Sequence, residues 1–272
     1  MSVMSFRASF VEEYTARAPL ALAFERTLEC VILAEQEFRR PVLDLGCGDG
    51  LFASVLFAEQ LDTGIDPDPD ELREAARTGA YRELIRCYGE RVPKPDESFQ
   101  TVFSNSVLEH IPDLLPVVKE VFRILAPGGV FYFTVPTNDF EIWTVINQCL
   151  TRAGLHRLSD AYRRFFNRFW RHYHAYDEEE WRALAAGSGF QVVEVSRYGA
   201  PRVGLVDDAL TPLALPSKLL KRFARRWVVF PALRRIILRP VRGLFRCWLT
   251  PVRHPAGCLA FVKAVKASVT AP

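Results

Sequence analysis

Residues 42–52 of the chain read VLDLGCGDGLF. An apolar run enters a glycine-rich stretch and then a helical pattern, which predicts a buried strand, a tight turn and a helix. Glycine lets the backbone turn sharply and approach a ligand closely, and the helix start offers free N–H donors. The stretch therefore predicts a ligand-binding turn at the carboxyl edge of a parallel sheet.

The spacing of the glycines limits which ligand this turn accepts. Gly46, Gly48 and Gly50 form Gly-x-Gly-x-Gly, whereas a dinucleotide site has Gly-x-Gly-x-x-Gly over a pyrophosphate. Asp44 precedes the turn, where its charge disfavours a pyrophosphate and suits an ammonium group. Asp66 comes 20 residues after Gly46, at the end of the next predicted strand, where a carboxylate can bind both ribose hydroxyls. The pattern disfavours a nicotinamide dehydrogenase.

Outward from this turn, short apolar runs alternate with helical patterns. Helices are predicted from an N-cap at Asp68, over residues 113–125, and from an N-cap at Asp177 over residues 178–186. Such alternation predicts an α/β fold, a mostly parallel sheet with helices on both faces. Strands are predicted at residues 42–45, 62–65, 101–104, 130–135, 191–196 and 258–265.

The composition is that of an ordinary globular chain. Of the 272 residues, 49% are apolar and 25% charged, which excludes a disordered or fibrous chain. No apolar run approaches the roughly 18 residues of a spanning helix, and residues 1–10 lack the apolar core of a secretory signal. The six cysteines form no Cys-x-x-Cys pair, which predicts reduced thiols and a cytoplasmic location.

The net charge of +3 conceals a strong asymmetry. No Asp or Glu follows Asp208, although 13 Lys and Arg residues do. The first 208 residues therefore hold 22 of the 35 basic residues against all 32 acidic ones, a balance of −10. A split of this kind indicates an interaction surface in the basic part.

These patterns divide the chain into segments. Residues 1–40 are predicted to form a helical cover, and residues 41–198 a core in which the aromatic-rich residues 137–176 form a lid. Residues 199–257 form a basic amphipathic insertion, and residues 258–272 a last strand and tail.

The basic insertion has the pattern of a helix lying at a membrane surface. A helical wheel places Leu220, Phe223, Trp227 and Phe230 on one face, with lysines and arginines opposite. We expect Trp227 and Trp248 to enter the lipid, on the inner face of the membrane. Two alternatives remain: the apolar face packs on the domain, or the charges bind nucleic acid. The second is disfavoured because the chain has no Asn/Asp-Pro-Pro-aromatic motif, which is typical of enzymes that modify base amines.

Four blocks carry a resemblance to a known family. Residues 43–50 (LDLGCGDG), 64–67 (GIDP), 104–112 (SNSVLEHIP) and 125–129 (LAPGG) resemble class I S-adenosylmethionine-dependent methyltransferases, of the type 11 small-molecule group. The resemblance implies the Rossmann-like class I fold, a seven-stranded and mostly parallel sheet whose last strand is antiparallel. It also implies S-adenosyl-L-methionine as the cofactor.

The resemblance also implies roles for individual residues. Gly46, Cys47 and Gly48 should line the methionine and ribose parts of the cofactor, with Asp44 and Gly50 completing the loop. Asp66 should hold the ribose, Pro67 the adenine, and Asn105 the methionine moiety, while Tyr14 should close over the cofactor. The family's Gly-Asp-Ala, whose Asp meets the adenine amino group, is replaced here by Cys87-Tyr88-Gly89.

Residues 109 and 110 are the candidates for catalysis. His110 follows a cofactor-binding strand, and a histidine with a pKa near 6.5 can accept a proton from an acceptor hydroxyl. Glu109 is the second candidate, and the alternative for His110 is a structural role at a helix start. His172-x-His174 lacks an acidic or cysteine partner, so we expect no metal site and assign these residues to the lid.

The sequence thus predicts methyl transfer to an oxygen or carbon nucleophile of an apolar or lipid-linked small molecule, at a membrane surface. The alternatives are a nucleic-acid methyltransferase and a cofactor-binding scaffold without activity. The oligomeric state stays open.

Overall fold

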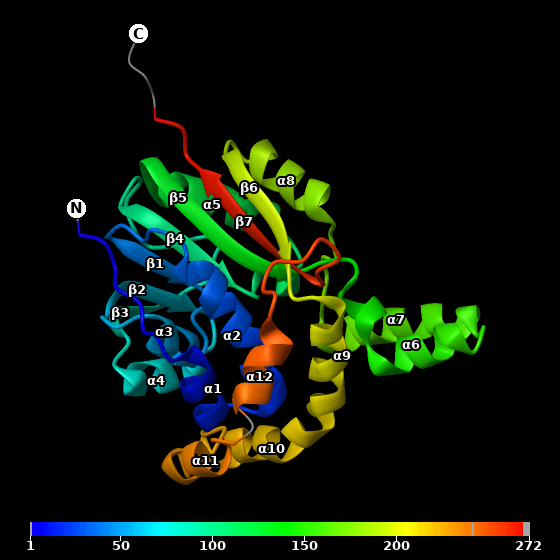
Figure 1. Cartoon of the computed structure of the whole chain (residues 1–272). Helices are drawn as coiled ribbons and strands as arrows, with labels where there is room; N and C mark the ends of the chain where they lie inside the picture. The colour runs from blue at the N-terminus through cyan, green and yellow to red at the C-terminus, as the bar shows by residue number, and fades with distance from the viewer. Residues whose placement is uncertain (1, 241, 269–272) are drawn as a thin grey trace.

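A computed structural model describes residues 2–240 and 242–268 of the chain. Its centre is a seven-stranded sheet in the order β3-β2-β1-β4-β5-β7-β6 (Figure 1). β1 to β5 are parallel, and β7 runs antiparallel to both β5 and β6. The predicted fold class is confirmed. The strands are β1 (Val42–Leu45), β2 (Leu61–Asp66), β3 (Tyr81–Arg86), β4 (Phe99–Asn105), β5 (Leu125–Pro136), β6 (Gln191–Tyr198) and β7 (Leu259–Val265).

All six strands predicted from the sequence are present. β3 is the strand that the sequence pattern missed, because its sequence YRELIR carries three charged residues. It lies at the edge of the sheet, where a strand tolerates charge. Residues 269–272 of the predicted tail lie outside the described residues.

Helices cover both faces of the sheet. The predicted N-caps are present: Asp68 accepts a hydrogen bond from the backbone of Asp70, and Asp177 forms a capping box with Glu180. The helices are α1 (Phe10–Arg17), α2 (Leu20–Ala34), α3 (Leu51–Leu56), α4 (Pro69–Thr78), α5 (Leu115–Ile124), α6 (Val145–Arg152), α7 (His156–Trp170), α8 (Glu178–Gly187), α9 (Pro201–Leu210), α10 (Leu215–Ala224), α11 (Pro231–Ile237) and α12 (Arg242–Leu249), with short 3₁₀ turns η1 (Leu108–His110), η2 (Phe140–Trp143) and η3 (Thr211–Ala214).

The two faces of the sheet bury separate apolar clusters. On one face, α1, α2 and α3 pack around Phe38, Phe57 and Phe103, whose rings meet edge to face. On the other, α5 and α8 pack against β4 and β5, with Trp181 against Phe133. The N-terminal helices therefore belong to the sheet's own core.

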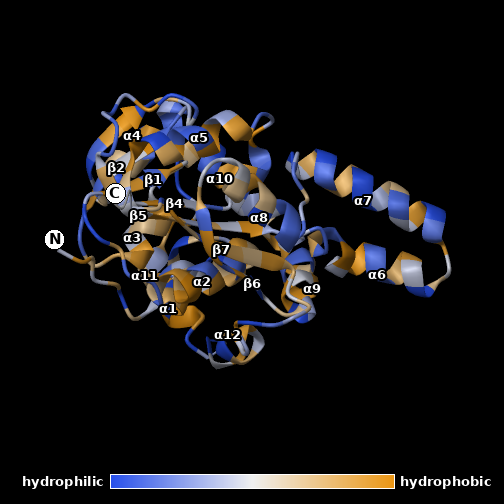
Figure 2. Cartoon of the chain, turned by 90° about the horizontal axis from the view of Figure 1, so that it is seen from above, coloured by the Kyte–Doolittle hydropathy of each residue, from blue (hydrophilic) through white to orange (hydrophobic). Residues whose placement is uncertain are grey.

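The segment predicted as a lid forms a helical hairpin. α6 and α7 pack against each other and project from the body of the domain (Figures 1 and 2). The polar and apolar residues of α7 lie on different sides of the helix. Part of the apolar side is exposed to solvent.

The basic insertion lies between β6 and β7, as α9 to α12. The helical wheel drawn over it is wrong, because α10 ends at Ala224 and Arg225 takes a left-handed conformation. Trp227 and Phe230 therefore do not continue the face of α10. Trp248 is also not free to enter lipid, since its ring packs against Phe24 on the domain.

Candidate active site

A cavity of about 430 Å³ opens where the chain switches sides of the sheet. From β1 the chain runs to β2 on one side, while β4 pairs with β1 on the other. Open α/β sheets bind ligands at such a point, beyond the carboxyl ends of the strands. The wall includes the loop after β1, the end of β4, the helices α1 and α2, the lid and the basic insertion.

The glycine loop has a backbone that other residues could not easily adopt. Gly46 has φ +79°, and a Cβ there would lie 2.6 Å from the side chain of Val107. Gly48 has φ +49°, and a Cβ there would have no atom within 4 Å. Contact with Val107 therefore requires glycine at position 46, whereas the backbone of Gly48 borders open space.

Asp66 lies beside this loop. Its Oδ2 accepts a hydrogen bond of 2.9 Å from the Gly48 N–H, and its Oδ1 accepts one of 2.9 Å from the Asp68 N–H. Burial raises the pKa of Asp66 above its ordinary value, although both hydrogen bonds oppose the shift. The carboxylate therefore ties the end of β2 to the loop after β1.

The predicted cofactor residues divide into two groups. Tyr14, Gly46, Cys47, Gly48 and Asn105 line the cavity, so the structure brings these five together. The other four do not belong to its lining: they are Asp44, Gly50, Asp66 and Pro67.

Asp44 is the residue whose environment differs most from the prediction. It is only 3% exposed, and its Oδ2 accepts a hydrogen bond of 2.6 Å from the Tyr81 hydroxyl on β3. Burial raises its pKa to about 7. Asp44 therefore connects strands β1 and β3 beneath the loop, outside the cavity lining.

A buried network on α2 was not found from the sequence. The Arg26 guanidinium donates to both oxygens of Glu29 at 2.7 Å, and Glu29 also accepts from Asn105 Nδ2 at 2.8 Å and Ser106 Oγ at 2.6 Å. Arg26 lines the cavity, while Glu29 is fully buried beneath it. An Arg and a Glu three residues apart within an apolar helical pattern were the available signal.

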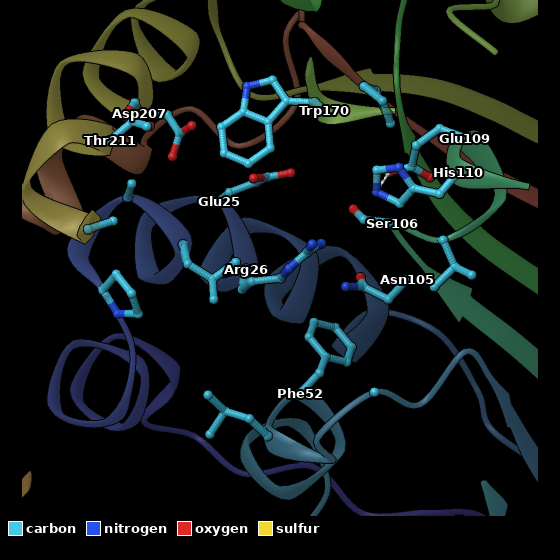
Figure 3. A pocket seen from close by; sticks show the side chains of 18 of the residues that line it. Glu25, Arg26, Phe52, Asn105, Ser106, Glu109, His110, Trp170, Asp207 and Thr211 are labelled. Carbon is cyan, nitrogen blue, oxygen red and sulfur yellow. Dashed lines mark hydrogen bonds and ion pairs between the residues drawn. The ribbon is translucent and has the colours of Figure 1, made fainter. Parts of the chain in front are cut away.

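The two catalytic candidates lie next to each other at the cavity wall (Figure 3). His110 Nδ1 lies 3.2 Å from the backbone oxygen of Arg171, so a neutral ring donates from Nδ1 and keeps its lone pair on Nε2. Nε2 lies 3.7 Å from Glu109 Oε1. Burial lowers the pKa of His110 and raises the pKa of Glu109 to about 8. Near neutral pH the ring is therefore neutral and the Glu109 carboxyl largely keeps its proton.

Aromatic lid residues also reach the cavity. Phe140, Phe166, Trp170 and His172 line it, whereas Phe165 and Phe169 are exposed on the outer side of α7. Of the four phenylalanine and tryptophan residues on α7, in the segment predicted as a lid, the structure thus brings two to the site.

The basic insertion closes the remaining side. Lys221 Nζ donates to Asp49 Oδ2 and to Glu71 Oε2, both at 2.9 Å, and Trp227 Nε1 donates to Asp49 Oδ2 at 2.8 Å. Burial alone would raise the pKa of Asp49, but Lys221 and these hydrogen bonds bring it below its usual value. The insertion is therefore attached to the glycine loop itself.

Many of the insertion's charges pair with the acidic core. Arg225 bonds Asp70, Arg235 bonds Glu13, Arg246 bonds Glu12, and Arg253 bonds Glu35 and Glu194. Arg222 and Arg226 are exposed, with no acidic partner among the described residues. The charge asymmetry of the sequence is thus partly neutralised within the fold.

No group of three metal-ligating side chains lies together in the described part of the chain. The His172 ring packs 5.3 Å from that of His110, and His174 Nε2 bonds the Ile111 backbone oxygen at 2.8 Å. In addition, no helix within residues 2–240 or 242–268 is long and apolar enough to cross a membrane.

This fold and this site define the class I methyltransferases. A family model described as a methyltransferase domain matches residues 12–195, and the chain belongs to that family. The cofactor of this class is S-adenosylmethionine, and the resemblance drawn from the four sequence blocks is confirmed. The open backbone at Gly48 and the Asp66 carboxylate beside it fit that cofactor.

Known proteins share either part of the sequence or the fold. An uncharacterized methyltransferase of Mycobacterium sp. (strain JLS) is 34% identical over 104 residues, which are 37% of this chain and 41% of the relative. The matched region thus spans about two fifths of the relative's length. A possible histamine N-methyltransferase from Thermotoga maritima superposes with a TM-score of 0.56 at 15% identity, covering 91% of each chain. The [4+2]-cyclase SpnF superposes with a TM-score of 0.55 at 16% identity, covering 90% of this chain and 81% of its own. At such identities the likeness concerns the fold alone.

Proposed function

We propose that the chain transfers the methyl group of S-adenosylmethionine to an apolar or lipid-linked small molecule that it takes from an anionic membrane surface. One observation carries the proposal: the insertion that closes the cavity also holds several strongly exposed large apolar side chains. Lys218, Lys221 and Trp227 face the cavity, while Phe223 is 81% exposed, Ile236 70% and Phe230 67%.

Within the cavity, the roles follow from position. The Gly46–Gly48 backbone and Asn105 in the lining, with Asp66 beside the loop, would hold the cofactor, which supplies an activated methyl group. Arg26, at the wall beside them, would face the carboxylate of its methionine part. Methyl transfer then needs mainly alignment and exclusion of water, which Phe166 and Trp170 would supply from the lid.

The Glu109–His110 pair would take the proton released by the acceptor. An acceptor hydroxyl, one of the oxygen or carbon nucleophiles expected from the sequence, would meet an imidazole whose lone pair is kept on Nε2 by the Arg171 carbonyl. Because burial lowers the pKa of His110, the ring is neutral and ready to accept at neutral pH.

The exposed basic side chains of the insertion favour a lipid surface, as its exposed apolar side chains do. Arg222 and Arg226 are exposed in the same segment as Phe223 and Phe230, so residues 222–230 offer solvent both cations and apolar side chains. Each basic residue near an anionic membrane contributes on the order of 1 kcal/mol, and buried apolar side chains add to this. An exposed apolar patch on a soluble domain also indicates an interaction site.

Co-sedimentation with vesicles tests the surface. The chain should pellet with vesicles containing phosphatidylglycerol and much less with phosphatidylcholine alone. Phe223→Ser combined with Phe230→Ser should abolish most of this binding, whereas Val3→Ser with Val193→Ser, at two exposed positions elsewhere, should not. Absence of binding to either vesicle would contradict the proposal. So would salt-sensitive binding to a DNA duplex without vesicle binding.

A separate measurement tests the enzyme itself. Calorimetric titration should show binding of S-adenosylhomocysteine to the wild-type chain. A chain that binds vesicles yet not S-adenosylhomocysteine would fail as a methyltransferase.

A further inference from the structure

One end of the cavity collects carboxyl groups from three different elements. Glu25 comes from α2, Asp207 from α9 and Glu109 from η1, and all three line the cavity. Figure 3 shows the Glu25 carboxylate beneath the indole ring of Trp170, with Asp207 on one side and Glu109 on the other. Asn105 and Ser106 lie nearer the glycine loop. The carboxyl groups therefore lie on the side of the cavity expected to receive the acceptor.

Two of these groups have an oxygen without a hydrogen-bond partner. Glu109 is 2% exposed, and neither its Oε2 nor Asp207 Oδ1 has a partner among the described residues, although both atoms are shielded from solvent. A buried carboxyl oxygen without a partner costs free energy. We therefore expect a bound ligand to donate hydrogen bonds to these two oxygen atoms.

The basic groups of the cavity do not fill this need. Arg26 donates to both oxygens of the buried Glu29, and Lys221 is held by Asp49 and Glu71. Burial lowers the pKa of His172 to about 4 and also lowers that of His110, so both rings are neutral near pH 7. Lys218 is the remaining basic group of the described cavity lining, and its ammonium lies over the Trp170 ring. Three carboxyl groups therefore share one cation, and a bound ammonium would lower their pKa values and keep them ionised.

The aromatic wall suits a cation with an apolar body. The Lys218 ammonium lies 4.3 Å from the centre of the Trp170 ring, which demonstrates that this ring accepts a cation at its face. Phe166 and Phe140 also line the cavity, and the Phe166 ring centre lies 6.3 Å from that of Trp170 and 6.1 Å from that of Phe140. A carboxylate set facing aromatic rings is the usual chemistry for binding an ammonium group.

We propose that this end of the cavity binds the methyl acceptor through a primary or secondary amine, held as an ammonium ion by Glu25, Asp207 and Glu109, with its apolar part against Trp170 and Phe166. The inference rests on the proposed methyl transfer and narrows its substrate class. It favours nitrogen over the oxygen or carbon nucleophile expected from the sequence.

Methyl transfer to such an amine has a complete proton and electron balance. The ammonium gives one proton to the lone pair on Nε2 of the neutral His110 ring, which lies 3.7 Å from Glu109 Oε1. The freed nitrogen lone pair forms the new N–C bond to the methyl carbon. The C–S bond breaks and its electron pair stays on sulfur, which leaves S-adenosylhomocysteine.

Matched probes test the acceptor class. Calorimetric titration of the chain saturated with S-adenosylhomocysteine should compare 2-phenylethylamine with 2-phenylethanol, which differ only in the group that meets the carboxylates. We expect the amine to bind at least about tenfold more tightly, as charge-assisted hydrogen bonds do. Glu25→Gln and Asp207→Asn should each remove most of this preference and keep the shape of the side chain. Asp160→Asn, on the exposed surface of α7, is the matched control and should keep it.

Each other outcome has a definite meaning. Equal binding of amine and alcohol would overturn the proposal, and so would an amine preference that survives in both variants. Weaker binding of S-adenosylhomocysteine in the two variants would assign the carboxylates to the cofactor's own ammonium group, which also overturns it. Since S-adenosylhomocysteine binding is measured first, failure of the proposed function is seen separately.

Discussion

The ammonium group of Lys221 lies 2.9 Å from Asp49 Oδ2, although 172 residues separate the two in the chain. Asp49 belongs to the glycine loop, and Lys221 belongs to α10 in the basic insertion. The same ammonium also bonds Glu71 on α4. One lysine therefore connects the basic insertion both to the glycine loop and to α4.

Removal of this lysine should loosen the closure. In Lys221→Met, two largely buried carboxylates lose their cation, which should lower the free energy of unfolding by roughly 1–3 kcal/mol. Urea denaturation measures this change. Arg225→Met breaks the more exposed pair with Asp70 and should cost under about 1 kcal/mol. Equal losses in both variants would mean that Lys221 has no special role.

The two glycines of the loop should respond differently to alanine. Gly46→Ala should destabilise the fold by roughly 2–4 kcal/mol, because the new Cβ meets Val107 and φ is positive. Gly48→Ala has free space for its Cβ and should cost only about 1 kcal/mol. Its methyl group would instead enter the space of the cofactor and weaken S-adenosylhomocysteine binding. Thermal unfolding with and without S-adenosylhomocysteine separates the two effects, and a stable Gly46→Ala chain would refute the packing argument.

Asp66 should contribute mainly to cofactor affinity. In Asp66→Ala, S-adenosylhomocysteine should bind about 10- to 100-fold more weakly, equivalent to roughly 1.4–2.8 kcal/mol, because a ribose-binding carboxylate and the acceptor of the Gly48 N–H are both lost. Calorimetry measures the affinity, with Glu179→Gln on the exposed surface of α8 as the control. Unchanged affinity would remove Asp66 from this role.

The buried carboxyl groups should make stability fall as pH rises. The folded-state pKa values of Asp44 and Glu25 are raised to about 7, and that of Glu109 to about 8, in each case chiefly by burial. The folded chain therefore holds more protons than the unfolded chain between about pH 4 and these values, and loses stability as they dissociate. In Glu109→Gln, the free energy of unfolding should fall less between pH 5 and 8 than in the wild type, by a difference on the order of 1–3 kcal/mol.

Urea titrations at several pH values measure that slope. Glu179→Gln, at an exposed position, should follow the wild-type curve. Parallel curves for wild type and Glu109→Gln would show that Glu109 does not titrate in this range.

Two phenylalanines of the insertion should differ in their effect on folding. Phe245 is buried, and its ring meets that of Phe24 edge to face at 5.4 Å, so Phe245→Ala should cost about 3–5 kcal/mol. Phe223 is exposed, and Phe223→Ala should change stability by no more than about 0.5 kcal/mol. Denaturant unfolding of the two variants is the comparison, and a large loss in Phe223→Ala would mean that its side chain is part of the core.

Much of the fold was predictable because its signals are local. The N-caps at Asp68 and Asp177 and the apolar runs of six strands depend on near neighbours in the chain. β3 was missed because an edge strand needs little apolar character. The glycine loop was found for the same local reason, since its backbone conformation requires glycine wherever it occurs.

The arrangement of the site could be predicted from the sequence only in part. The sequence by itself determined the class of fold, the cofactor loop and the uneven distribution of charge, because each is set by neighbouring residues or by composition. Only the tertiary structure decided that Asp44 is buried against Tyr81, that Arg26 and Glu29 lie beneath the cavity, and that Glu25, Asp207 and Glu109 meet around one space. These groups come from distant segments, and their protonation and pairing depend on burial and on neighbours that no local pattern records.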